Sequence, residues 1–331
     1  MTKIGVLGAG TWGMALARML CNAGKEVLVW SALPEEIDEL RRSRRQRNLP
    51  DMEIPAAIGF TKSVEEVCTG RDLLLFAVPS VYVRATARLA APHVPDGQLI
   101  VDVAKGIEPD TLLTLREVIE SEIPRAAVVT LSGPTHAEEV ARDLPSTIVA
   151  ACADTRRAET VQAVFSCPTM RVYTNTDAKG VELCGALKNI IALASGICMG
   201  LGYGDNTRAA LITRGLAEIK QLGLRMGCLA ETFSGLAGMG DLIVTATSQH
   251  SRNNQCGYFI GQGNSPEEAV RKVGMVVEGL HALPAAMELA QRYKAEMPIV
   301  HAVDDIIHHG VQPREAVWQL MGRDWKTELT A

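Results

Sequence analysis

The chain has 331 residues, enough for two domains, and 47% of them are hydrophobic, which provides for a large core and argues against disorder. The net charge of -5 argues against a general nucleic-acid-binding protein, which would usually be basic. The eight cysteines form no C-x-x-C pair and no cluster with histidines, which indicates a reduced, cytoplasmic protein without a structural metal.

The beginning of the chain predicts a dinucleotide-binding unit. A buried strand at 3–7, with no signal-like stretch before it, runs into the stretch GAGTWG. A helical pattern and a second strand follow over residues 14–30. In this arrangement Gly8 permits the tight turn, Gly10 lets the backbone approach a pyrophosphate, and Gly13 lets the helix pack on the strand.

The end of the second strand bears on the choice between NAD and NADP. An NAD-binding unit normally carries Asp or Glu about 20 residues after the glycines, to hold the ribose hydroxyls. Here Ser31 follows the strand and no carboxylate comes before Glu35, so we expect a 2′-phosphate to meet no fixed repulsion. A basic run follows at Arg41, Arg42, Arg44, Arg45 and Arg47. It could reach the cofactor, but a solvated helix face and loop is the favoured interpretation, so both cofactors stay open.

Strand-like and helix-like segments alternate up to about residue 176, which predicts a parallel, doubly wound sheet. The further strands are expected at 58–61, 72–78, 98–103, 126–131, 148–151 and 170–173, with helices near 64–68, 81–91 and 112–123. Ligands of such sheets bind beyond the carboxyl ends of the strands. Three unusual strand ends fall there, at 78–80, at Lys105-Gly106 and at 132–137, where small residues open a helix.

From about residue 177 the pattern becomes helical. Helical spacing is found at 207–222, 229–233, 266–273, 282–293, 297–309 and 314–321. We therefore predict an N-terminal Rossmann-type α/β domain over 1–176 and an all-helical substrate-binding domain over 177–331.

Lys188 lies in the middle of an almost wholly apolar stretch, residues 180–196. A helix there would be buried, and a buried ammonium must be paired or have a lowered pKa. Glu182 is six residues away and therefore not on the same helical face. Either the lysine extends to the surface from a core helix, which is the commoner case, or it lines a cleft and transfers protons. The stretch is long enough for a membrane helix, but its charged residues and glycines indicate a core helix and no integral membrane segment.

Two further stretches in the helical half carry polar groups. A glycine-rich loop over 235–240 ends on the carboxylate of Asp241. Ser251 is expected to cap a helix start at which Arg252 and Asn253 form a plausible anion site.

Taken together, these segments resemble those of the bacterial NAD(P)-dependent glycerol-3-phosphate dehydrogenases, in order and over essentially the whole chain. The matching stretches are GAGTWG from Gly8, Lys105-Gly106, SGPTHA from Ser132, GVELCGALKNIIALASG from Gly180, NTRAALITRG from Asn206, GLAGMGDL from Gly235, SRNNQCG from Ser251 and VVEG from Val276.

The resemblance implies a cytoplasmic enzyme, expected as a homodimer, that reversibly reduces dihydroxyacetone phosphate to sn-glycerol 3-phosphate for phospholipid synthesis. It implies Lys188 as the proton-exchanging group, Lys105 as a second cation that lowers its pKa, and Asp241 as the carboxylate that orients it. The implied substrate-side residues are Lys105, Gly133, Thr135, Lys188, Asn189, Asp241, Ser251, Arg252 and Asn253. The implied cofactor-side residues are Gly8, Gly10, Thr11, Trp12, Gly13, Lys105, Ala137, Arg252, Val276 and Glu278, and no metal is implied.

Two positions depart from the family pattern. Similar enzymes often carry a basic residue just after the second strand, where this chain has Ser31-Ala32-Leu33, and a tyrosine before Leu-Pro, where it has Asn48. Two other functions stay open as alternatives. A related hydroxy-acid dehydrogenase, of the 6-phosphogluconate or ketopantoate type, would share the fold. A non-catalytic nucleotide sensor would keep the glycines but would not need Lys188, Lys105 and Asp241 together.

Overall fold

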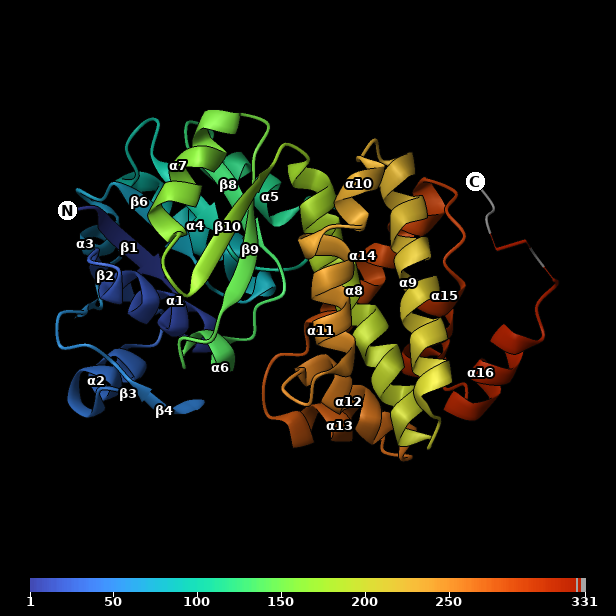
Figure 1. Ribbon diagram of the computed structural model, residues 1–331. Helices are drawn as coiled ribbons and strands as arrows, with labels where there is room; N and C mark the ends of the chain where they lie inside the picture. The colour runs from blue at the N-terminus through green and yellow to red at the C-terminus, as the bar shows by residue number, and fades with distance from the viewer. Residues whose placement is uncertain (326, 329–331) are drawn as a thin grey trace.

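The first half of the chain builds one eight-stranded sheet, which lies beside a helical second half in the computed structural model of residues 1–325, 327 and 328 (Figure 1). The strands run in the spatial order β10-β9-β8-β7-β6-β1-β2-β5. Their bounds are β1 (Lys3–Leu7), β2 (Glu26–Trp30), β5 (Gly59–Thr61), β6 (Leu73–Phe76), β7 (Leu99–Asp102), β8 (Ala127–Ser132), β9 (Ser146–Ala151) and β10 (Met170–Asn175).

The prediction of a parallel sheet is confirmed for the pairs from β5 to β8 and for β9 with β10, but it is wrong for β8 with β9, which pair antiparallel. The connection between these two strands, residues 133–145, contains only the one-turn helix α6 (Ala137–Val140). A parallel pair needs a crossover of a dozen or more residues, usually a full helix that carries the chain back along the sheet. One helical turn cannot do this, so the chain simply reverses.

Helices cover both faces of this sheet, because alternate strand residues are buried on opposite sides. Val6 and Leu75 belong to one apolar cluster, and Leu7 and Leu74 to another. The helices of this half are α1 (Thr11–Asn22), α2 (Pro34–Ser43), α3 (Val64–Cys68), α4 (Val83–Ala90), α5 (Leu115–Glu122) and α7 (Thr155–Phe165), with short 3-10 turns η1 (Ser80–Tyr82) and η2 (Ala91–His93).

Helix α7 and the hairpin of β3 (Arg45–Gln46) and β4 (Leu49–Glu53) were not predicted from the sequence. Helix α2 was expected only as a helix face that carries part of the basic run, without bounds. Helix α5 was predicted, but it begins three residues later than expected. Leu112 has a φ of 59°, which no helix accommodates, and Thr114 then caps the helix in a capping box with Glu117.

Helix α8 (Ala178–Gly200) is the centre of the helical half (Figure 1). It packs against α9 (Asp205–Arg225), α11 (Asp241–Thr247), α12 (Arg252–Gly261) and α14 (Glu278–Arg292). It is long and apolar enough to cross a membrane, but 89% of its most apolar window is buried inside the protein, as expected of a core helix. The other elements are α10 (Ala230–Phe233), η3 (Leu236–Gly240), α13 (Pro266–Val273), α15 (Pro298–His308) and α16 (Pro313–Met321).

Helices α8 and α12 touch each other backbone to backbone. A Cβ atom added at Gly196 would lie 2.0 Å from the carbonyl oxygen of Asn254, and one at Gly257 would lie 2.0 Å from that of Leu193. Gly200 and Gly261 make equally close approaches. Small residues four apart on both helices allow this contact, which fixes the N-terminus of α12 relative to the middle of α8.

Candidate active site

Lys188 points into the protein rather than out of it. Its side chain is 6% exposed, and its Nζ donates hydrogen bonds to Asp241 Oδ1 at 2.5 Å and to Thr245 Oγ1 at 2.7 Å. The commoner alternative, a lysine that extends from a core helix to the surface, is therefore wrong for this chain. A buried, hydrogen-bonded lysine is the arrangement that the proton-transfer hypothesis requires.

Asp241 joins Lys188 to a second lysine from the other half of the molecule. Lys105, just after β7, places its Nζ 2.6 Å from Asp241 Oδ2 and 3.1 Å from the carbonyl oxygen of Gly133. Thr135 donates to the same carbonyl. Two cations thus share one carboxylate, which is 1% exposed, at the seam between the sheet and the helices.

This geometry shifts the pKa of Lys188 and the pKa of Asp241. Burial lowers the pKa of Lys188 to about 7, the negative charge of Asp241 opposes that shift, and the nearby charge of Lys105 adds to it. Burial alone would raise the pKa of Asp241, but the two lysines outweigh it and hold that pKa below its usual value. Asp241 stays charged, while Lys188 can gain or lose its proton near neutral pH.

A π-helical turn sets the position of Asp241. The glycine-rich stretch predicted as a loop is η3, directly before α11. A Cβ atom at Gly238 would lie 2.2 Å from the carbonyl oxygen of Phe233, so only glycine permits this turn. Asp241 follows this turn directly as the first residue of α11. Thr245, one turn later on the same face, was missed, although its spacing from Asp241 could have revealed it.

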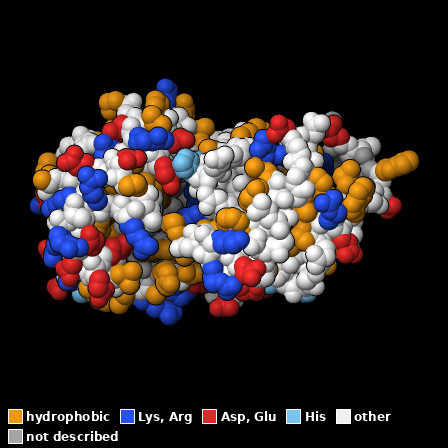
Figure 2. Space-filling view, turned by 90° about the horizontal axis from the view of Figure 1, so that it is seen from below, with side chains coloured by type: hydrophobic (Ala, Val, Ile, Leu, Met, Phe, Trp, Pro, Cys, Tyr) orange, Lys and Arg blue, Asp and Glu red, His pale blue; other side chains and the backbone are white. Residues whose placement is uncertain are grey.

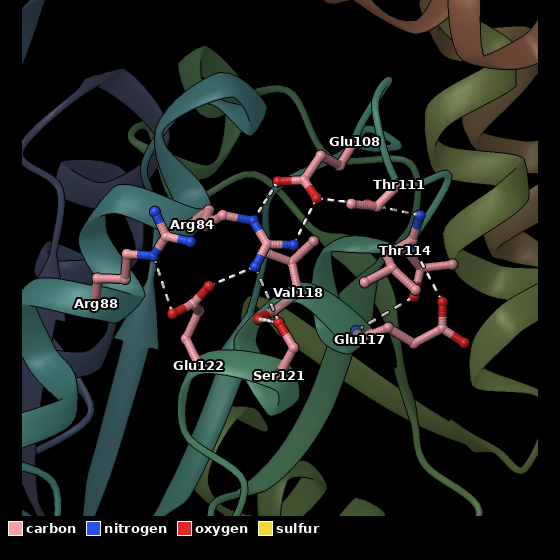
Figure 3. Close-up of polar contacts among 10 residues, drawn as sticks. Arg84, Arg88, Glu108, Thr111, Thr114, Glu117, Val118, Ser121 and Glu122 are labelled. Atoms are coloured by element: carbon pink, nitrogen blue, oxygen red, sulfur yellow. Dashed lines mark hydrogen bonds and ion pairs between the residues drawn. The ribbon is translucent and has the colours of Figure 1, made fainter.

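Arg84 binds the loop that follows Lys105, and Figure 3 shows its contacts with Glu108 and Glu122. The guanidinium donates to both carboxylate oxygens of Glu108, at 2.7 and 2.5 Å, and it also binds Glu122 and Ser121 on α5. Hydrogen bonding to Arg84 lowers the pKa of Glu108. Because Glu108 lies three residues after Lys105, this network fixes the loop on which the lysine stands.

The start of α12 has the expected cap. Ser251 Oγ accepts a hydrogen bond from the backbone N–H of Asn254, and Arg252 is the exposed first residue of the helix. Asn253 is buried: its amide nitrogen donates to Asn189 Oδ1 at 3.0 Å, and its oxygen accepts from the N–H of Gly279. Asn189 and Asn253 therefore join α8, α12 and α14 behind the exposed helix end.

The glycine-rich turn between β1 and α1 is open at its middle glycine. Gly8 has a φ of +120°, and a Cβ atom there would lie 2.5 Å from the carbonyl oxygen of Ala77. A Cβ atom at Gly13 would lie 2.2 Å from the carbonyl oxygen of Gly8. At Gly10, by contrast, a Cβ atom would meet no atom within 4 Å. The fold itself requires the first and third glycines, and the second leaves open space before the first N–H groups of α1, which suits a pyrophosphate.

The remaining predicted cofactor residues lie around this turn or across from it. Thr11 and Trp12 begin α1, and Ala137 begins α6, which packs against α1. Val276 precedes α14, and Glu278, its first residue, accepts hydrogen bonds from the N–H of Ser80 at 3.2 Å and from its Oγ at 2.5 Å. Ser80 follows β6, so Glu278 reaches from the helical half to the carboxyl end of the sheet.

A carboxylate does lie at the end of β2. Ser31 Oγ donates to Glu36 Oε2 at 2.6 Å, although Glu36 comes from the first turn of α2. A carboxylate that the sequence places after the strand end thus lies next to it in space. The sequence concealed this contact because the chain turns back on itself between the two residues.

Three arginines of the basic run donate to backbone carbonyls near them, which a purely solvated helix face and loop would not do. Arg41, Arg44 and Arg45 donate to the backbone carbonyls of Phe60, Ile58 and Pro50. The hairpin β3–β4 next to them lies over the glycine-rich turn: Gln46 Nε2 is 3.5 Å from the carbonyl oxygen of Ala9, and Asn48 Nδ2 is 3.3 Å from Thr11 Oγ1. Asn48, where relatives often carry tyrosine, thus lies against a predicted cofactor residue.

Charges of both signs are mixed on the face of the molecule that Figure 2 shows. Figure 2 shows Lys and Arg side chains interspersed with Asp and Glu, and a hollow where the two halves meet. Among residues 1–325, 327 and 328, no group of three or more His, Cys, Asp or Glu side chains is placed to hold a metal ion.

Known proteins share both the sequence and this architecture. The chain matches the NAD-dependent glycerol-3-phosphate dehydrogenase N-terminus over residues 3–158 and the corresponding C-terminus over residues 177–318. It is 66% identical, with 100% of both chains covered, to a glycerol-3-phosphate dehydrogenase (NAD(P)+) of Lactobacillus delbrueckii subsp. bulgaricus. It is 50% identical to the one of Agathobacter rectalis, over 99% of this chain and 98% of that one.

Solved structures of similar proteins have the same fold. The crystal structure of glycerol-3-phosphate dehydrogenase from Coxiella burnetii has a TM-score of 0.94 at 35% identity, over 97% of this chain and 99% of that one. A ketopantoate reductase from Ralstonia eutropha reaches a TM-score of 0.64 at 15% identity, over 96% of this chain and 100% of that one, which shows a shared fold alone. The chain belongs to the NAD-dependent glycerol-3-phosphate dehydrogenase family.

Proposed function

We propose that this protein catalyses the reversible, NAD(P)-dependent interconversion of dihydroxyacetone phosphate and sn-glycerol 3-phosphate, which supplies glycerol 3-phosphate for phospholipid synthesis. The observation that carries the proposal is the cluster of Lys188, Asp241 and Lys105 between a dinucleotide-binding turn and a helix start suited to an anion. The family to which the chain belongs supports it. A nucleotide sensor would have no need for a buried lysine that exchanges protons near neutral pH.

Lys188 is the proposed proton donor and acceptor. The nicotinamide, when bound beyond Gly8 and Gly10, supplies or accepts the hydride. Negative charge grows on the substrate oxygen during reduction, and the Lys188 ammonium stabilises it and gives up a proton, a step typically worth ~10²–10⁴-fold. In oxidation, the neutral amine takes the hydroxyl proton. The pKa of about 7 makes both forms of Lys188 available.

The other roles are assigned on position. Arg252, exposed beside the Ser251 cap, would bind the phosphate, since a planar guanidinium and a helix N-terminus both favour a dianion. Gly133, Thr135, Asn189 and Asn253 would form the rest of the substrate side. The cofactor side would consist of the glycine-rich turn with Thr11 and Trp12, then Lys105, Ala137, Arg252, Val276 and Glu278.

The same proposal includes the organisation of the chain. We divide it into a dinucleotide-binding domain over 1–176 and a substrate-binding domain from 177, because the last strand ends at Asn175 and α8 begins at Ala178. A homodimer in the cytoplasm completes the proposal. All eight cysteines are free thiols, which supports a reducing compartment.

A spectrophotometric assay tests the function directly. Dihydroxyacetone phosphate should be reduced at the expense of NADH or NADPH, whereas ketopantoate and 6-phosphogluconate, with their cofactors in the matching redox state, should give no comparable turnover. If a hydroxy acid of either type is used in preference to the triose phosphate, the assignment of substrate is wrong and only the fold-level relation stands.

Arg252→Lys should raise the KM for dihydroxyacetone phosphate by roughly tenfold, about 1.4 kcal/mol, although the charge is kept. The reason is that the ammonium lacks the two-pronged donor geometry of a guanidinium. Unphosphorylated dihydroxyacetone should be a poor substrate that the substitution scarcely affects. Arg271→Lys, at an exposed arginine on α13, is the matched control. Equal losses with the phosphorylated and unphosphorylated substrates would remove Arg252 from the phosphate site.

A further inference from the structure

The end of β2 is the place at which this chain departs from its family pattern, and the structure gives it a partner. We propose that Glu36, held there by Ser31, selects the cofactor: its carboxylate disfavours a 2′-phosphate and makes NAD(H) the preferred cofactor over NADP(H). This inference rests on the proposed function, which requires a nicotinamide cofactor but leaves its kind open.

The first step is the position of the strand end. β2 runs parallel to β1, with Trp30 opposite Leu7, and the N–H of Gly8 donates to the carbonyl oxygen of Trp30 at 2.9 Å. Ser31 therefore lies beside the start of the glycine-rich turn. In dinucleotide-binding units, this is the location of the acidic residue that accepts hydrogen bonds from the ribose hydroxyls of NAD.

The second step is the carboxylate itself. Ser31 is 7% exposed; its Oγ accepts from the N–H of Leu33 at 3.2 Å and donates to Glu36 Oε2 at 2.6 Å. That donor bond and the N-terminus of α2 hold the carboxylate of Glu36 at this place and both favour a negative charge there. The residue is half-buried, so solvent screens its charge less than that of a surface glutamate. A glutamate from the next helix thus takes the place that a strand-end acid usually occupies.

The third step concerns the arginines near this place. A site for NADP usually offers an arginine to the 2′-phosphate. Here Arg41, Arg44 and Arg45 donate to backbone carbonyls, and Arg42 forms an ion pair with Glu39. These four guanidinium groups are directed at their own surroundings, while Arg47 is exposed between Gln46 and Asn48 on the hairpin. A phosphate dianion next to Glu36 would meet repulsion that these groups do not relieve, and such a repulsive contact is an effective means of specificity.

The test is equilibrium binding, which needs neither substrate nor turnover. Binding of NADH and of NADPH is followed by quenching of tryptophan fluorescence in the full-length protein, and adenosine 2′,5′-bisphosphate is compared with 5′-AMP as a competitor. The unaltered protein should bind NADH at least about tenfold more tightly than NADPH. Glu36→Gln should remove most of this difference by tightening NADPH binding. The glutamine oxygen can still accept from Ser31, so the fold is kept.

Two variants serve as references. Glu35→Gln removes an equal charge from the same helical turn at an exposed neighbour, and it should leave the NADH to NADPH ratio unchanged. Ser31→Ala frees the carboxylate to move and should shift the ratio in the same direction as Glu36→Gln, but less. Tighter binding of NADPH than of NADH by the unaltered protein, or an unchanged ratio in Glu36→Gln, would overturn the proposal. Normal nucleotide binding without reduction of dihydroxyacetone phosphate would instead contradict only the proposed function.

Discussion

Lys188→Met should lower the turnover of dihydroxyacetone phosphate by ~10²–10⁴-fold while the protein folds and binds cofactor as before. Methionine matches the length and apolar character of the lysine stem in the core helix α8, but it has no proton to give. Asp241 keeps its second partner, since Lys105 lies 2.6 Å from the other carboxylate oxygen. Steady-state kinetics and cofactor binding, measured on the same preparation, separate chemistry from packing. Lys179→Met, at a more exposed lysine of the same helix, should leave turnover intact.

The pH profile of the unaltered enzyme provides an independent readout. Lys188 must be protonated to donate in reduction, so kcat/KM for reduction should fall as the pH rises through about 7. The neutral amine is needed in oxidation, so that rate should rise over the same interval. Both inflections should disappear from the residual activity of Lys188→Met. Near-normal turnover in this variant would show that Lys188 only fills space in the core.

Asp241→Asn should strongly lower the rate of reduction at pH 7 and destabilise the fold by about 3–5 kcal/mol. The substitution keeps the shape of the side chain but leaves two lysines near each other in a buried site without a negative charge. Because Asp241 raises the pKa of Lys188, its loss should lower that pKa further and leave the lysine neutral at pH 7. Urea unfolding measures the stability, and the pH profile of any residual reduction measures the pKa.

Asp38→Asn is the matched control for this substitution. Asp38 also binds a lysine, Lys62, at 2.7 Å, but both side chains are exposed, so the loss should be about 0–1 kcal/mol. If Asp241→Asn lowered the unfolding midpoint no more than this control does, Asp241 would not be needed to compensate the charges of the two buried lysines.

The glycine-rich turn and the burial of the helix that carries Lys188 were predictable because each depends on neighbours in the sequence, whereas the direction of the Lys188 side chain was not. The turn needs glycines at fixed spacings, and an apolar stretch around a lysine leaves little of a helix for solvent. The resemblance pointed to Asp241 and Lys105, but only the fold shows that one carboxylate lies between both lysines, from residues 53 and 136 positions away.

What the sequence concealed depends on how the chain turns. Strand direction at β9 followed from the short connection before it, which no pattern within the strand reveals. The contact between Ser31 and Glu36 arises because the chain reverses into α2, so a carboxylate absent from the strand end in the sequence is present there in space. The spacing of Thr245 from Asp241 is informative only if both lie on one helix, and the sequence analysis assigned residues 235–241 to a loop.

The glycine contact between α8 and α12 determines which parts of the molecule can move. Each glycine within a helix costs about 1 kcal/mol relative to alanine, so Gly196, Gly200, Gly257 and Gly261 together sacrifice roughly 4 kcal/mol of intrinsic helix stability. At these glycines the backbones of the two helices are in direct contact. Lys188 and Arg252, which the two helices carry, therefore belong to one rigid unit. A motion that admits or releases ligands must therefore change other contacts. The hydrogen bonds between Ser80 and Glu278, where the two halves meet through side chains, are one such contact.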